Sequence, residues 1–85
     1  MGAGKILIMS YLIETEIKGH KYWLRTEEIL NQQGMAHPNN FNLSFQGLID
    51  NATEYPSLHK ADKMISIVQR RTRNHLNAVQ KPKIN

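Results

Sequence analysis

The hydrophobic pattern of the first third of the chain predicts a β-hairpin. Residues 6–17 are rich in β-branched and aromatic side chains, and apolar and acidic positions alternate after Glu14, as in a half-buried strand. A second such run covers residues 20–25 and contains two adjacent aromatic residues. Gly19, between the runs, can adopt the positive φ that a tight turn needs. We therefore expect two antiparallel strands at about 6–17 and 20–25.

Capping residues and helical spacing predict two short helices after the hairpin. Thr26 has the position of an N-cap for a helix at about 27–33, which Gly34 would end. Ser44 has the same position before a second helix at about 45–53, where apolar residues recur on one face. Both helices are short, so each would depend on packing against the rest of the chain.

A longer helix is predicted at about 58–80. Ser57 can cap its start and Pro82 would prevent its continuation. Its apolar positions recur at three- and four-residue steps and share one arc of the helix; they are Leu58, Ala61, Ile65, Val68, Thr72, Leu76 and Val79. The sequence thus predicts an α+β fold of one small domain over residues 1–85, with 81–85 as a flexible basic tail.

Charge is divided unevenly along the chain. Residues 57–85 hold seven of the eleven Lys and Arg residues and one of the seven acidic residues, so this segment carries +6 and the remainder −2. On the predicted helix the basic residues lie opposite the apolar arc, which makes a continuous basic face. An anionic partner would meet this segment first.

The basic segment supplies the candidate binding residues. Arginine and lysine neutralise phosphate charge, and asparagine can hydrogen-bond phosphates or base edges. Ile67 lies among the basic residues, either as a packing contact with a partner or as an ordinary exposed apolar residue. The expected contacts are Lys60, Lys63, Ile67, Arg70, Arg71, Arg73, Asn74, Asn77, Lys81 and Lys83.

Two functions fit this surface. The first is a small regulatory or accessory protein that binds nucleic acid, DNA rather than RNA, with the third helix entering a groove. The alternative is an inhibitor or adaptor whose basic helix docks on an acidic or nucleic-acid-mimicking surface of a larger protein. The charge could also serve only to keep an amphipathic helix soluble. At 85 residues the core is small, so a homodimer is a further expectation.

Other chemistry finds little support in the sequence. The four histidines have neither i, i+4 spacing nor cysteine companions, so we expect no metal and no cofactor. The serines lack a recognisable base partner, so we expect no catalytic residues and no enzyme activity. The first apolar run is too short to span a bilayer, which predicts no membrane association. The absence of cysteine fits a reducing compartment, and we expect a cytoplasmic location.

Overall fold

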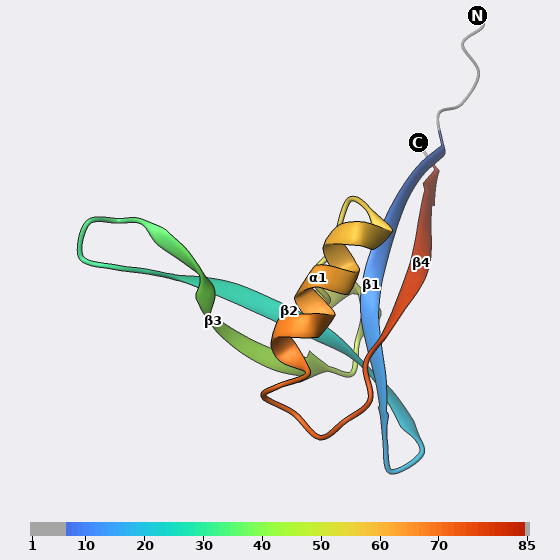
Figure 1. Cartoon of the computed structure of the whole chain (residues 1–85). Coiled ribbons are helices and arrows are strands. Elements are labelled where there is room, and N and C mark those ends of the chain that lie inside the picture. The colour runs from blue at the N-terminus through green and yellow to red at the C-terminus, as the bar shows by residue number, and fades with distance from the viewer. Residues whose placement is uncertain (1–6, 85) are drawn as a thin grey trace, which may run out of the picture.

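The computed structural model of the chain describes residues 7–84, with side chains described for 9–37 and 40–81. It is an antiparallel sheet of four strands in the order β3-β2-β1-β4, with one α-helix on one face (Figure 1). The elements in chain order are β1 (Leu7–Ile17), β2 (His20–Leu30), β3 (Ala36–Gln46), the 3-10 turn η1 (Ile49–Asn51), α1 (Leu58–Val68) and β4 (Asn77–Ile84).

The sheet consists of two ribbons that separate from a shared turn. β1 and β2 pair next to the turn, where Glu14–Ile17 lie opposite His20–Trp23. Beyond this point β1 pairs with β4 to form the β1–β4 ribbon, and β2 pairs with β3 to form the β2–β3 ribbon. Figure 1 shows the β2–β3 ribbon leading away from the β1–β4 ribbon, which ends near the chain termini.

A strap of residues 52–56 fills the space where β1 and β2 separate. Tyr55 exchanges two backbone hydrogen bonds of 2.8 Å with Tyr11 of β1. Thr53 donates its N–H to the carbonyl of Leu24 on β2 over 3.1 Å, and its hydroxyl accepts the N–H of Thr26 over 2.8 Å. The strap therefore satisfies backbone groups that the divergence of the strands would leave unpaired.

Helix α1 closes the core on one face of the sheet. Ser57 caps it as predicted, because its hydroxyl accepts the N–H of Lys60 over 3.2 Å. Ala61 and Val68 are fully buried, and the helix packs mainly on β1 and β4. The buried apolar cluster brings together residues from β1, β2, β3, the strap, α1 and the connection before β4, namely Ile13, Leu24, Phe41, Tyr55, Ala61, Val68 and Leu76.

The predicted α+β arrangement is wrong after the first hairpin. Residues 27–30 continue β2, because Thr26 and Glu28 pair with Leu43 and Phe41 of β3. Thr26 consequently caps no helix. Gly34 ends no helix either: it lies in the β2–β3 turn with φ of +76°.

The second predicted helix, at 45–53, is also absent. Ser44 and the first two residues of that range belong to β3, and only the single 3-10 turn η1 follows. Pairing with β2 decides this, because it gives the backbone hydrogen bonds that a short, weakly stable helix containing Gly47 would have to form alone.

The long helix predicted at 58–80 ends at Val68. Residues 77–84 instead form β4, where Val79 pairs with Leu12 of β1 and Lys81 with Ser10. Residues 81–84, expected to belong to a flexible tail, therefore lie in a strand, and residue 85 lies outside the described residues.

The side chain of Gln69 organises the connection between α1 and β4. Its Nε2 donates to the carbonyls of Thr72 over 3.4 Å and Asn74 over 2.8 Å. Its Oε1 accepts the N–H of Leu76 over 3.2 Å. These bonds hold the chain in a turn directly after the helix, so they replace the helical bonds that continuation would have supplied.

Candidate functional site

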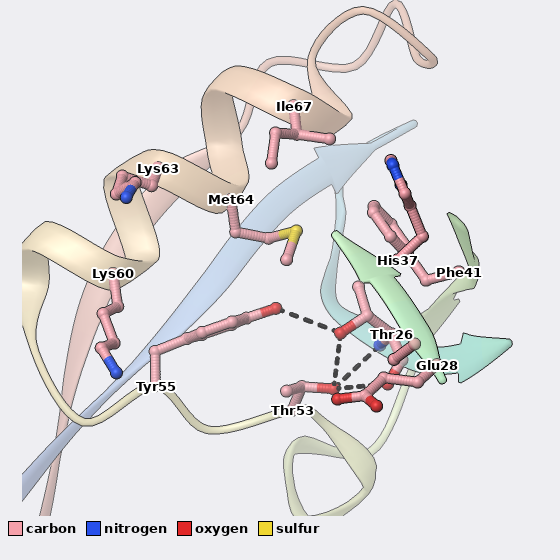
Figure 2. Close-up of a pocket in the computed structure, with 11 residues that line it drawn as sticks. Thr26, Glu28, His37, Phe41, Thr53, Tyr55, Lys60, Lys63, Met64 and Ile67 are labelled. Atoms are coloured by element: carbon pink, nitrogen blue, oxygen red, sulfur yellow. Dashed lines mark hydrogen bonds between the residues drawn. The ribbon is translucent and has the colours of Figure 1, made fainter. Parts of the chain in front are cut away.

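An open groove lies between α1 and the β2–β3 ribbon. Its volume is about 590 Å³, which is within the range of ligand sites in proteins. Figure 2 shows the helix as one wall, with the β-strands opposite and the strap below. The residues that line it are Thr26, Glu28, Ala36, His37, Phe41, Thr53, Tyr55, Lys60, Lys63, Met64 and Ile67.

The helix presents an apolar and a basic row to the groove. Since Ala61 and Val68 face the sheet, helical geometry places Lys60 and Ile67 on one flank of the helix and Lys63 farther round on the same flank, away from the sheet. Met64 lies between this flank and the core and is partly buried. In Figure 2, the Met64 thioether extends into the groove toward the strands. The helix thus contributes two apolar side chains to the groove and two ammonium groups to its rim.

The strap and β2 form the base of the groove through a hydroxyl cluster. The Tyr55 hydroxyl lies 3.3 Å from that of Thr26, which is 3.5 Å from the hydroxyl of Thr53. Tyr55 is buried, and this burial raises the pKa of its phenol above 10.0, while the hydrogen bond with Thr26 opposes the rise. The ring of Tyr55 therefore serves as a neutral, largely apolar surface at physiological pH.

Because the pKa of Tyr55 is raised, the free energy of unfolding should vary with pH in the alkaline range. Above pH 10 the unfolded chain loses the phenol proton that the folded chain retains, so the free energy of unfolding should fall as the pH rises. Tyr55→Phe should cost about 0.5–1.5 kcal/mol at neutral pH by removing the hydrogen bond with Thr26. It should also make the alkaline decline shallower.

Urea unfolding of both proteins at several pH values between 8 and 11 measures this effect. The difference between wild type and Tyr55→Phe should shrink as the pH rises past 10.0. A constant difference across that interval would contradict the assignment.

The charges around the groove are mostly positive. Lys60 and Lys63 lie on the helix side, and Glu28 is the one carboxylate among the lining residues. A smaller hollow of about 290 Å³ shares Ile67 with the groove and adds Arg70 and Arg71. The rim of the groove is therefore positively charged on the helix side and carries one negative charge on the strand side. The positive side continues past the end of the helix to Arg70 and Arg71.

Arg71 ties this cationic side to β3. Its guanidinium carbon lies 4.4 Å from the centre of the Phe41 ring, and Nη1 donates to the Phe41 carbonyl over 3.1 Å. This combination of stacking and hydrogen bonding fixes the guanidinium against the edge of the sheet. Phe41 consequently belongs both to the core and to the groove wall.

The structure separates the ten predicted contact residues into groups. Lys60, Lys63 and Ile67 line the groove, while Arg70 and Arg71 line the adjoining hollow. These five residues lie together as predicted, although the last two follow the helix rather than continue it.

The other predicted contacts lie elsewhere. Arg73 and Asn74 are in the turn that Gln69 holds, and Asn77 begins β4. Lys81 forms ion pairs with Glu54 at 3.5 Å and Asp50 at 3.8 Å. Residue 83 lies in β4, with its side chain outside the described set. The continuous basic face predicted along a helix of residues 58–80 is therefore absent, because α1 ends at Val68.

Sequence reasoning missed the whole strand wall of the groove. Ala36, His37 and Phe41 come from a segment that its proline and asparagines mark as a polar connection, and Tyr55 comes from the strap. Phe41, as a large apolar residue within polar surroundings, was the available signal of burial.

Within residues 7–84 no group of three or more His, Asp or Glu side chains could hold a metal ion. No helix in the same range is long and apolar enough to cross a membrane. Comparison of the chain with protein-family models, with curated proteins and with solved structures finds no match.

Proposed function

We propose that this chain is a small protein-binding module, and that its groove captures a segment of another protein in which apolar side chains are flanked by acidic ones. The single observation that supports this most is the combination of an apolar groove wall, made by Phe41, Met64 and Ile67, with the lysines at its rim. Apolar burial supplies affinity, and the opposite charge supplies orientation and a faster association.

The shape of the site favours a peptide segment over a small molecule. The groove is open rather than enclosed, and its two walls are regular secondary structures that hold their spacing. A segment laid along it could place apolar side chains against Ile67 and Met64 and acidic ones near Lys60 and Lys63. Glu28, on the strand side, would disfavour the opposite placement of the acidic groups.

The test begins with a displayed library of random peptides selected on the immobilised chain. We expect enriched sequences to combine leucine or phenylalanine with aspartate or glutamate. One enriched peptide is then synthesised, labelled and titrated by fluorescence anisotropy. Reversing the charge of both lysines, Lys60→Glu with Lys63→Glu, should weaken binding of the peptide at least about tenfold. Each substitution removes an attraction to the acidic residues of the peptide and introduces a repulsion, and the two effects add.

A matched control distinguishes the effect of the two groove lysines from the effect of the net charge of the chain. Lys18→Glu with Lys21→Glu changes the net charge equally at exposed positions beside the first turn. This variant should bind within about twofold of wild type. Ile67→Asp should also abolish binding if the groove is the site. Enrichment of peptides without acidic residues would refute the proposal. So would equal binding by wild type and the Lys60→Glu, Lys63→Glu variant.

Nucleic-acid binding is a second candidate, and the clustering of Lys60, Lys63, Arg70 and Arg71 favours it. A helix of residues 58–80 in a major groove no longer supports it, since α1 ends at Val68. Titration of duplex and single-stranded DNA at several salt concentrations tests it. Binding that falls steeply with salt and weakens in Arg70→Ala would favour this second function over the first.

Both candidates are binding functions without catalysis or cofactor. A cytoplasmic location forms part of the proposal, and the absence of cysteine supports it.

A further inference from the structure

The smaller hollow beside the groove has the size and charge of a site for one anionic group. Its volume is about 290 Å³, just below the range of about 300–1,000 Å³ for sites that hold a whole small molecule. The residues that line it are Ser66, Ile67, Arg70 and Arg71, and none of these described lining residues is acidic. The hollow therefore fits one group of a larger ligand.

The guanidinium of Arg71 is held in place on the wall of this hollow. Its carbon lies 4.4 Å from the centre of the Phe41 ring, and Nη1 donates to the Phe41 carbonyl over 3.1 Å. An aromatic ring and a carbonyl position a guanidinium without cancelling its positive charge. Because the side chain is already ordered, it loses little conformational entropy when an anion binds.

Arg70 brings a second positive charge to the same hollow. Its side chain is exposed, and it forms no ion pair with any of the described residues. The acidic residue nearest to it in sequence is Asp62, two turns earlier on α1, and Asp62 is outside the set of lining residues. The two arginines therefore match a group with two negative charges.

One bound segment can reach both the groove and the hollow, because Ile67 lines both of them. We propose that the segment captured by the groove carries a phosphorylated serine or threonine, and that its phosphate binds in the hollow to Arg70 and Arg71. A short side chain suffices, since Ile67 borders both spaces. This inference rests on the function proposed above and narrows the class of partner to a phosphorylated segment.

Charge and shape favour a phosphate monoester over other anions. It carries about −1.5 to −2 at pH 7 and has three strong acceptor oxygens, so one group can accept hydrogen bonds from two guanidiniums. A carboxylate has a single charge and two oxygens. The phosphodiesters of a nucleic acid also carry one charge each, and Glu28 on the strand side of the groove would repel a row of them.

A series of matched peptides tests the phosphate site. One peptide enriched on the groove is synthesised with serine, glutamate or phosphoserine at each non-anchoring position in turn, and each version is titrated by fluorescence anisotropy. At one position, phosphoserine should bind at least about tenfold more tightly than serine and at least about threefold more tightly than glutamate. Arg70→Gln should bring the ratio of the serine Kd to the phosphoserine Kd below about threefold.

Two further variants separate the hollow from charge in general. Arg73→Gln removes the same charge at an exposed position outside the lining set, and its ratio should stay within about twofold of wild type. Arg71→Lys keeps the charge but loses the planar fork, so its ratio should fall. Circular dichroism should show each variant folded.

The outcomes distinguish this inference from the function on which it rests. If Ile67→Asp abolishes binding of the serine peptide but no phosphoserine position reaches the threefold advantage over glutamate, the phosphate site is wrong and the proposed function stands. If binding of the serine peptide is absent or survives Ile67→Asp, both fail. Displacement of the labelled phosphopeptide by single-stranded DNA at lower concentrations than by unlabelled phosphopeptide would assign the hollow to nucleic acid and overturn the proposal.

Discussion

Leu24→Ala is expected to lower the free energy of unfolding by about 2–5 kcal/mol, the largest loss from any single substitution considered for this chain. Leu24 is fully buried, and it lies where β2, β3 and the strap meet. Alanine would leave a cavity between Phe45, its cross-strand partner, and the rest of the core. Because small domains have only about 5–15 kcal/mol of stability, this substitution should remove a large part of the total.

Urea unfolding followed by circular dichroism gives this difference directly. The denaturant midpoint should fall while the slope stays constant, since the surface exposed on unfolding changes little. Leu48→Ala makes the same chemical change at a side chain that is 68% exposed. It should change stability by less than about 0.5 kcal/mol. Equal effects at the two positions would show that the core is not centred on Leu24.

Gln69→Leu is expected to lower the free energy of unfolding by roughly 2–4 kcal/mol. The substitution removes three hydrogen bonds to the turn after α1, each of which contributes about 0.5–1.5 kcal/mol. Leucine is apolar and one bond shorter, so it leaves the N–H of Leu76 and the carbonyls of Thr72 and Asn74 without these partners. Leu76 is buried, so its unpaired N–H should contribute much of the cost.

The same substitution at an exposed glutamine provides the control. Gln80→Leu lies in β4 and should change stability by less than about 0.5 kcal/mol. Hydrogen exchange adds a local measurement. The amide of Leu76 should exchange faster in Gln69→Leu, and the amides in the middle of α1 should change in line with global stability alone. Unchanged protection at Leu76 would contradict the role given to Gln69.

Local signals in the sequence were reliable where a few neighbouring residues decide the conformation. Gly19 lies in the first turn with φ of +84°, and the strands on either side of it form the expected hairpin. Ser57 caps α1, and Ala61 and Val68 are buried as the helical spacing indicates. Caps, turns and the first turns of a helix depend on contacts within about four residues, so they can be read along the chain.

Helical spacing failed where strands pair with distant segments. Val79 fits the apolar arc of a helix, yet it also alternates correctly for β4 opposite Leu12. A few apolar residues can satisfy both periods, and without Gly or Pro between Val68 and Val79 the sequence contains no stop signal. Pairing with β1, far away in the chain, decides between them.

In the candidate site, too, one wall follows from local signals in the sequence and the other depends on strand pairing. Lys60, Lys63 and Ile67 come together because they follow one another at steps of about one helix turn, and their association was predictable from this spacing. Their opposite wall comes from Phe41 and His37, which reach the groove only after β3 pairs with β2. That pairing has no local signature, because the segment is rich in asparagine and contains Pro38.

The amino-acid pattern thus contains the first hairpin, the start and buried face of α1, and the excess of positive charge after residue 57. The tertiary structure decided where the helix stops, which segments become β3 and β4, and that part of the basic surface borders an apolar groove. The physical reason is the separation along the sequence over which each interaction acts. Capping and helical spacing act between close neighbours, whereas a strand is stable only when a partner strand supplies its hydrogen bonds. Here β4 pairs with β1 from the other end of the chain, and β3 pairs with the preceding strand β2 along a ribbon much longer than a capping or helical signal.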